Sequence, residues 1–186
     1  MTSFYVINPT YGFDQLLKER GYTVYTTGTL GNHDPDVVCW MGGTDINPAI
    51  YNEEPHRFTQ HPDNNRDKRE LDLLQRYKDK RKIGICRGAQ LIAAYNGAKL
   101  QQHITGHTSG IHKVTDNKGN SHIVCSVHHQ AVIPCEGINV IAVAHDGIPE
   151  VMYIPEDKAL LFQGHPEFGP EPCTEYFFQL LEEYIL

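Results

Sequence analysis

The chain has 186 residues, of which 40% are hydrophobic and 21% are charged, and we expect one domain that covers residues 1–186. Its formal net charge of −7 argues against nucleic acid as a partner, because phosphate binding needs a basic surface. The sequence shows no apolar run of membrane-spanning length, so we expect no membrane partner. It shows no signal peptide, and its five cysteines are an odd number, which together favour free thiols in a cytoplasmic protein.

Short apolar runs alternate with amphipathic segments through the first half of the chain. The runs predict strands at 4–7, 22–26, 37–41 and 82–85, and the amphipathic segments predict helices at 13–20, 67–80 and 89–95. A long loop with three prolines follows the third strand, and loops of that length are usually functional or disordered. The β-α-β order with buried strands predicts a doubly wound, parallel α/β sheet, in which ligands bind at the carboxyl ends of the strands.

The second half has short strand-like runs separated by turns. We expect strands at 121–127, 139–145, 150–154 and 160–163, and interpret all four as antiparallel additions to the sheet. A final helix is expected to begin at Pro170 or Pro172 and to continue through Tyr184. The predicted fold class is therefore α/β, with a mostly parallel sheet and antiparallel additions in the second half.

A reactive cysteine is predicted at the end of the fourth strand. Cys86 has a glycine two residues away on each side, at Gly84 and Gly88, and a helix-forming run follows at once. This is the pattern of a nucleophile elbow, a sharp strand-to-helix turn that exposes its central side chain. The helix N-terminus there favours the thiolate form of the sulfur. The alternative is a buried structural cysteine between ordinary turn residues.

Nucleophilic cysteine chemistry also needs a base and a group that orients the base. Among the 11 histidines, His165 is the best candidate, because it follows the last apolar strand and precedes Pro166 and Glu167. Residues i and i+2 of an extended chain project to the same side, so the Glu167 carboxylate can hold the imidazole. A satisfied structural histidine at a strand end is the other interpretation.

Backbone N–H groups at the same sheet edge can stabilise an oxyanion. The elbow supplies one at Arg87, and Gly42-Gly43 after the neighbouring strand can supply a second, unless these glycines form a plain turn. A zinc site is the competing use of so much histidine and cysteine, but no Cys-x-x-Cys or His-Glu-x-x-His spacing is present. His128 and His129 are adjacent and would point to opposite faces of a strand. We therefore expect no metal and no cofactor.

These residues resemble a known family. Gly84-Ile-Cys-Arg-Gly-Ala-Gln90 with the later His165-Pro-Glu167 is similar to the class I glutamine amidotransferase superfamily, and most similar to its gamma-glutamyl-gamma-aminobutyrate hydrolase group, peptidase family C26. Further matching segments lie in the family's order along nearly the whole chain, namely 42–48 with Tyr51, Arg66-Asp67 with Glu70, 126–132, and 144–147 with Glu150.

The resemblance implies a flavodoxin-like sheet and a catalytic triad of Cys86, His165 and Glu167. It also implies an oxyanion hole from the backbone of Gly43 and Arg87. Gln90 and the segment His128, His129 and Gln130 are implied to hold the glutamyl part of a small-molecule substrate, although His129 can equally be structural. The chain departs from the family in the short connection before Val37 and at 96–102. Loops that shape the amine-side pocket can therefore differ, so the resemblance does not identify the leaving amine.

The expected activity is cysteine-dependent hydrolysis of γ-glutamyl amide bonds through a γ-glutamyl thioester on Cys86. Two alternatives remain open. The chain can be a glutaminase subunit that delivers ammonia to a separate synthetase partner, or a thiol sensor or binding module that uses a related sheet without catalysis. The sensor needs no oriented base, so His165 and Glu167 argue against it.

Overall fold

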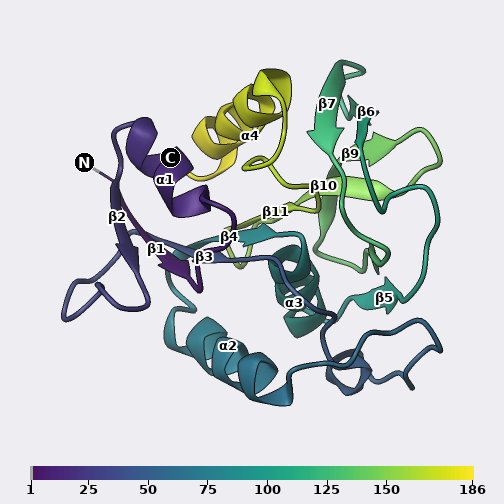
Figure 1. Cartoon of the computed structure of the whole chain (residues 1–186), viewed down its shortest axis with the longest axis horizontal. Helices are drawn as coiled ribbons and strands as arrows, with labels where there is room; N and C mark the ends of the chain where they lie inside the picture. Colours follow the sequence, from purple (N-terminus) through teal and green to yellow (C-terminus); the bar gives the residue numbers. More distant parts are fainter. Residues whose placement is uncertain (1) are drawn as a thin grey trace.

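The computed structural model describes residues 2–186, which form a nine-stranded sheet with helices on both faces (Figure 1). The strand order is β2-β1-β3-β4-β11-β10-β9-β6-β7. The first five are parallel to one another, and these are β2 (Thr23–Thr26), β1 (Ser3–Ile7), β3 (Val37–Trp40), β4 (Arg81–Ile85) and β11 (Ala159–Phe162). The other four join by antiparallel pairing, and these are β10 (Pro149–Ile154), β9 (Asn139–Ala144), β6 (Ile111–Asp116) and β7 (Ser121–Cys125). The predicted fold class is confirmed.

Helices cover both faces of the sheet in two layers (Figure 1). One layer holds α1 (Phe13–Glu19) and α4 (Glu171–Tyr184), and the other holds α2 (Asn64–Arg76) and α3 (Arg87–Tyr95). Alternate residues of β1 supply the two apolar cores, since Phe4 and Val6 pack toward α1 and α4 while Tyr5 and Ile7 pack toward α2 and α3. This burial on both faces explains why the parallel strands read as continuous apolar runs.

Two predicted features need correction. The strand expected at 160–163 is not an antiparallel addition, because β11 pairs with β4 in parallel and is buried along its whole length. Helix α2 begins and ends earlier than the expected range of 67–80. Asp63 caps the helix by accepting hydrogen bonds from the N–H groups of Asn65 and Arg66, at 3.1 and 3.0 Å, and Tyr77 closes its C-terminus.

Sequence patterns also missed several short elements. Strand β6 carries polar residues and only one fully buried side chain, so it does not appear as an apolar run. A separate two-stranded sheet joins β5 (Lys99–Gln101) to β8 (Ala131–Ile133), and a 3-10 helix, η1 (Pro48–Tyr51), lies inside the long loop after β3. These pairings depend on residues far apart in the chain, which local periodicity cannot detect.

The sheet places three chain segments at one edge. Strands β3, β4 and β11 are adjacent and parallel, so the residues that follow them emerge side by side. These residues are Gly42-Gly43, Cys86 and His165. The carboxyl edge of a doubly wound sheet is where ligands usually bind, so the topology alone brings the predicted site residues together.

Candidate active site

The turn at Cys86 has the backbone of an elbow. Cys86 lies between β4 and α3 with φ +50° and ψ −109°, an unfavourable conformation for a residue with a Cβ atom. The flanking glycine before it is needed for space, because a Cβ atom at Gly84 would lie 2.6 Å from the Cα atom of Ala89. A strained backbone conformation persists only where the surrounding structure stabilises it, and such residues are frequent at active sites.

His165 connects the sulfur to a carboxylate. Its Nδ1 lies 2.8 Å from Glu167 Oε1, and its side chain also interacts with that of Cys86. Burial alone would lower the pKa of His165, but hydrogen bonds with Cys86 and Glu167, and the negative charge on both, raise it to about 10. The ring is therefore an imidazolium near neutral pH, with one N–H directed at the carboxylate.

The contact between His165 and Glu167 is made by a turn. The sequence predicts an extended chain with both side chains on one side, but residues 166–168 form a turn in which the Phe168 N–H donates to the His165 carbonyl at 3.3 Å. Pro166 suits the second position of such a turn because its φ angle is fixed. The predicted pair is thus close in space, for a different geometric reason.

Arg66 orients the peptide that joins Gly42 to Gly43. Its Nη2 atom donates to the Met41 carbonyl at 3.1 Å and to the Gly42 carbonyl at 2.9 Å. In a trans peptide the N–H points away from the carbonyl, so the Gly43 N–H is directed away from Arg66. Gly43 lines the cavity beside Cys86, so this geometry supports its predicted use as an oxyanion donor.

A buried ion-pair network connects Arg66, which contacts the Gly42 carbonyl, with Arg87, which follows Cys86. The Arg87 side chain pairs with Asp67 and Glu70 of α2, and Glu70 also accepts from Arg66 Nε at 2.7 Å. The Arg87 side chain is therefore held against α2 and does not line the cavity beside Cys86. Its backbone N–H lies in the first turn of α3, where N–H groups have no intrahelical acceptor. Spacing alone did not predict this network, although Arg66, Asp67 and Glu70 belong to the family-like segments.

Cys86 and His165 line a cavity of about 370 Å³ at the sheet edge. The residues predicted to bind substrate all line it as well, namely Gln90, His128, His129 and Gln130. Six further residues line the cavity and were not predicted as site residues, namely Tyr11, Thr44, Asp45, Gln60, Val127 and Phe168, although Thr44, Asp45 and Val127 lie in the family-like segments. Tyr11 could have been found, because it follows β1 and so reaches the same carboxyl edge, and its ring packs against Phe168 at a centroid distance of 4.4 Å.

His128 and His129 do not belong to a strand. They lie in the loop between β7 and β8, which contradicts the expectation of a strand beside the pocket. His128 Nε2 faces Glu150 Oε1 at 3.2 Å, whereas His129 Nε2 faces Asp45 Oδ1 at 3.1 Å. The loop lets both residues line the cavity while their ring nitrogens contact different carboxylates.

Comparisons with known proteins agree with this architecture. A provisionally assigned glutamine amidotransferase of Mycobacterium tuberculosis is 36% identical over 149 residues, which are 68% of this chain and 48% of that protein. The glutamine amidotransferase-like protein YvdE of Lactococcus lactis is 30% identical over 165 residues, 76% of this chain and 69% of that protein. The carbamoyl phosphate synthase small chain of Escherichia coli is 32% identical over 116 residues, 55% of this chain and 29% of that protein. The chain thus spans about half the length of the first of these relatives.

A solved structure shows the same fold. The glutamine amidotransferase of Thermotoga maritima matches all of this chain and 86% of its own with a TM-score of 0.64, at 18% identity. The identity with YvdE, over 76% of this chain and 69% of that protein, shows that the chain belongs to the class I glutamine amidotransferase-like superfamily, and its α/β sheet agrees with this. Within that superfamily, residues 34–124 match the model of the family Peptidase C26. No helix in residues 2–186 combines the length and apolarity needed to cross a membrane.

Proposed function

We propose that this protein hydrolyses γ-glutamyl amide bonds, of glutamine or of a γ-glutamyl-amine, through a γ-glutamyl thioester on Cys86. The observation that carries the proposal is the position of His165, which interacts with both Cys86 and Glu167 at the wall of a cavity of small-molecule size. A strained cysteine, a histidine that can give and take a proton, and an orienting carboxylate are the parts that nucleophilic catalysis requires.

In the first step the Cys86 thiolate attacks the amide carbon, and the carbonyl oxygen becomes an oxyanion. The N–H groups of Gly43 and Arg87 donate to that oxyanion. The C–N bond then breaks as the His165 imidazolium gives its proton to the departing nitrogen. Ammonia or an amine leaves, and the glutamyl group remains on sulfur as a thioester.

In the second step neutral His165 removes a proton from water, which attacks the thioester carbon. The C–S bond breaks, glutamate leaves, and the thiolate and imidazolium are restored. Glu167 accepts a hydrogen bond from Nδ1 of His165 at 2.8 Å in the resting protein, which keeps Nε2 toward the reacting atoms.

The other cavity residues can hold the glutamyl part of the substrate. Gln90 is fixed by bonds from its Nε2 to the Gln130 carbonyl and to Gln163 Oε1, both at 3.2 Å. The His129–Asp45 pair adds a carboxylate to the wall, and a carboxylate is a suitable partner for the α-ammonium group of a glutamyl substrate.

The direct test is turnover by the purified chain. We expect it to release glutamate from glutamine or from γ-glutamyl-amines, and to show a γ-glutamyl adduct on Cys86 by mass spectrometry after rapid acid quench. A protein that turns over none of these substrates and forms no adduct would contradict the proposal.

The similarity to a carbamoyl phosphate synthase small chain favours a second candidate, a glutaminase subunit that passes ammonia to a synthetase partner. The same turnover experiment separates the two. Weak activity on glutamine that rises only after a synthetase is added supports the subunit, whereas full activity of the isolated chain on γ-glutamyl-amines supports the hydrolase.

A thiol sensor is the third and weakest candidate. It uses the thiolate but has no need of the His165–Glu167 pair at 2.8 Å. A glutamine-mimicking diazoketone distinguishes the two uses, because a catalytic Cys86 is alkylated in the glutamine pocket. If Cys86 resists this reagent but readily forms sulfenic acid, the sensor is favoured.

Glu167→Gln is expected to lower kcat/KM by about 10²- to 10⁴-fold, the range of general acid–base effects. Since Glu167 helps to raise the pKa of His165 to about 10, the alkaline fall of kcat/KM should begin at lower pH in the variant. The raised pKa of His165 also stabilises the fold. This contribution is complete below pH 6.5, the ordinary pKa of histidine, and it is lost as the pH rises through about 10. A pH–rate profile with an unshifted alkaline limb would argue against the role of Glu167.

Arg66→Leu is expected to lower kcat by about 10²-fold with little change in KM, because the Gly43 N–H loses its fixed direction toward the oxyanion. The matched control is Arg69→Leu, an exposed position on the same helix, which should retain wild-type kinetics. Steady-state kinetics, with thermal unfolding to verify folding, check the prediction. Equal losses in both variants would mean that Arg66 acts only through the stability of α2.

A further inference from the structure

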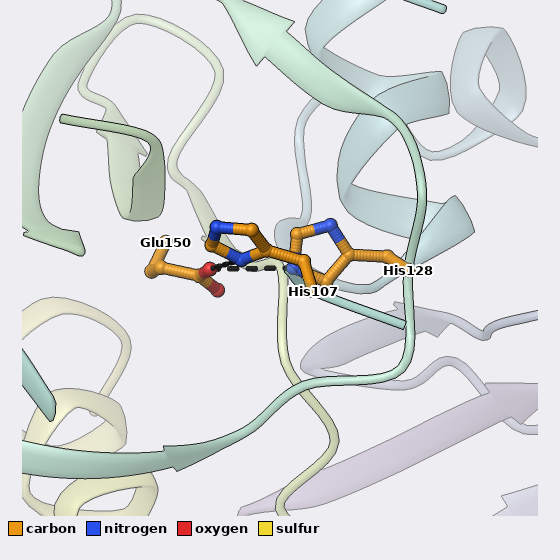
Figure 2. Close-up of side chains that lie close together, drawn as sticks. All are labelled: His107, His128 and Glu150. Atoms are coloured by element: carbon orange, nitrogen blue, oxygen red, sulfur yellow. Dashed lines mark hydrogen bonds and ion pairs between the residues drawn. The ribbon is translucent and has the colours of Figure 1, made fainter. Parts of the chain in front are cut away.

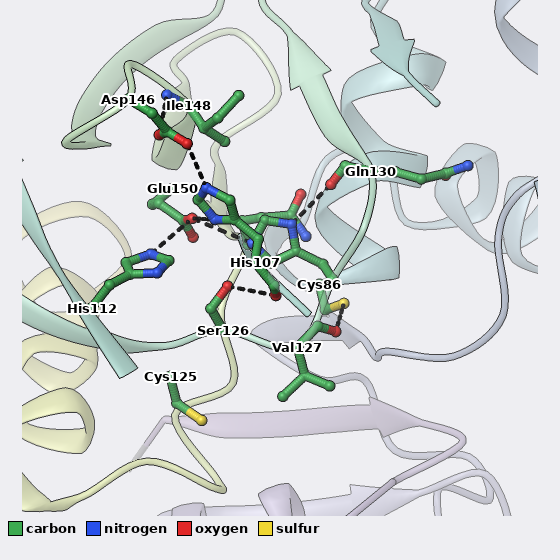
Figure 3. Close-up of polar contacts among 12 residues, drawn as sticks. Cys86, His107, His112, Cys125, Ser126, Val127, Gln130, Asp146, Ile148 and Glu150 are labelled. Carbon is green, nitrogen blue, oxygen red and sulfur yellow. Dashed lines mark hydrogen bonds and ion pairs between the residues drawn. The ribbon is translucent and has the colours of Figure 1, made fainter. Parts of the chain in front are cut away.

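A second group of histidines surrounds Glu150, outside the proposed catalytic residues (Figures 2 and 3). Glu150 lies on β10 and is fully buried. Its Oε1 atom lies 2.9 Å from His107 Nδ1, 3.1 Å from His112 Nε2 and 3.2 Å from His128 Nε2. The three rings come from the loop before β6, from β6 itself and from the loop before β8. The proposed hydrolysis uses none of the contacts to Glu150.

The hydrogen-bond pattern of this carboxylate is unbalanced. Three ring nitrogens converge on Oε1, while the buried Oε2 has no partner among residues 2–186. A carboxylate oxygen has two lone pairs, and donors are normally shared between the two oxygens. The three nitrogens lie at hydrogen-bond distances from Oε1, so the feature that points to a missing partner is the buried, unpartnered Oε2 beside two histidine rings.

On the side away from Glu150, the rings of His107 and His128 make the hydrogen bonds that metal-binding histidines usually make. His107 Nε2 faces Asp146 Oδ2 at 3.0 Å (Figure 3). His128 Nδ1 faces the Gln130 carbonyl at 2.9 Å. Metal-binding histidines almost always donate their second N–H to a carboxylate or a backbone carbonyl, which fixes the ring and its tautomer. Both kinds of outer partner are present here, so each ring directs its other nitrogen inward.

The spacing and charge of the group suit a divalent transition metal. One ligand atom from each of His107, His128 and Glu150 lies within 4.8 Å of the other two. Tetrahedral zinc with bonds of about 2.0–2.1 Å separates its ligands by roughly 3.3 Å, so small side-chain movements would open the position. Two imidazoles and a carboxylate are a donor set that zinc accepts.

We propose that His107, His128 and Glu150 form a zinc-type metal site. All three side chains are buried, which favours a structural role, with a water molecule to complete the tetrahedral coordination. The metal joins β10 and the loop before β6 to the loop that carries His128 and Gln130 in the cavity wall. Short motifs predicted no metal because the three ligands are spread from residue 107 to residue 150.

The test measures zinc binding by the whole chain in a Cys86→Ser background, which removes the elbow thiol as a competing ligand. After treatment with a chelator and dialysis against dilute Zn²⁺, we expect about one zinc ion per chain by elemental analysis. Glu150→Gln and His107→Gln should lose this ion, and Asp146→Asn should weaken its binding by about 10- to 100-fold. The control is His122→Gln, since His122 pairs with Asp116 outside the group.

Anomalous diffraction from zinc-soaked crystals of the Cys86→Ser chain provides a measurement that needs no ligand variant. A zinc peak between His107, His128 and Glu150 supports the site even if Glu150→Gln fails to fold. The proposal is overturned if the Cys86→Ser chain retains no stoichiometric zinc, if the peak lies elsewhere, or if the folded ligand variants bind zinc as well as the His122→Gln control.

Discussion

Cys86→Ala is expected to lower kcat/KM for glutamine or a γ-glutamyl-amine by at least about 10⁴-fold, since the proposed reaction then has no nucleophile. Neither water nor His165 can replace the sulfur in a covalent step. The substitution removes one sulfur atom at the wall of an existing cavity, so the fold should persist. Steady-state kinetics and the loss of labelling by a glutamine-mimicking diazoketone measure the effect.

Cys135→Ser is the matched control for this prediction. Cys135 is also a free thiol, but it lies half-buried beside the carbonyl of Asn96 and does not line the cavity. This variant should keep wild-type turnover and should still be labelled at Cys86. If Cys86→Ala retained more than a small fraction of the activity while Cys135→Ser lost it, the assignment of the nucleophile would be wrong.

The sequence predicts the elbow of the candidate site well because that part is local. Cys86 with its flanking glycines specifies a turn between a strand and a helix within a few residues, and the structure has that turn. The position of His165 depends on topology, since β11 pairs in parallel with β4 and ends at the same edge, whereas we expect an antiparallel strand there from the sequence. Residue type therefore singles out the sulfur and the imidazole, but only the assembled sheet shows why they lie at one edge.

What the sequence did not predict depends on contacts between distant segments. Glu150 lies within hydrogen-bond distance of His107, His112 and His128, and no short sequence motif predicts these contacts. Arg66 acts on the Gly42 carbonyl, which lies 24 residues earlier in the chain, across the long loop after β3. Patterns of three to eight residues describe strands and turns, whereas these polar contacts exist only once the sheet is assembled.

Gly88→Ala is expected to damage both stability and activity. A Cβ atom at Gly88 would lie 2.1 Å from the carbonyl oxygen of Trp40 and 2.5 Å from its carbonyl carbon, and both belong to the backbone of β3 in the middle of the sheet. Alanine favours a helix over glycine by about 1 kcal/mol, but overpacking a buried position costs about 1–3 kcal/mol or more. Because backbone rather than a flexible side chain blocks the Cβ atom, we expect the clash to dominate, with a net loss of about 2 kcal/mol and a Tm lower by about 4–8 °C.

The steric clash should also lower the proposed activity, because it is relieved only if α3 moves away from β3. That movement displaces Cys86 and the Arg87 N–H relative to Gly43, and a misplacement of about 1 Å can cost about 10²-fold in rate. Gly28→Ala is the matched control, since a Cβ atom there meets nothing within 4 Å. Its free energy of unfolding should change by no more than about 0.5 kcal/mol. If Gly88→Ala matched this control in both Tm and turnover, the close packing of α3 on β3 would not be what positions the elbow.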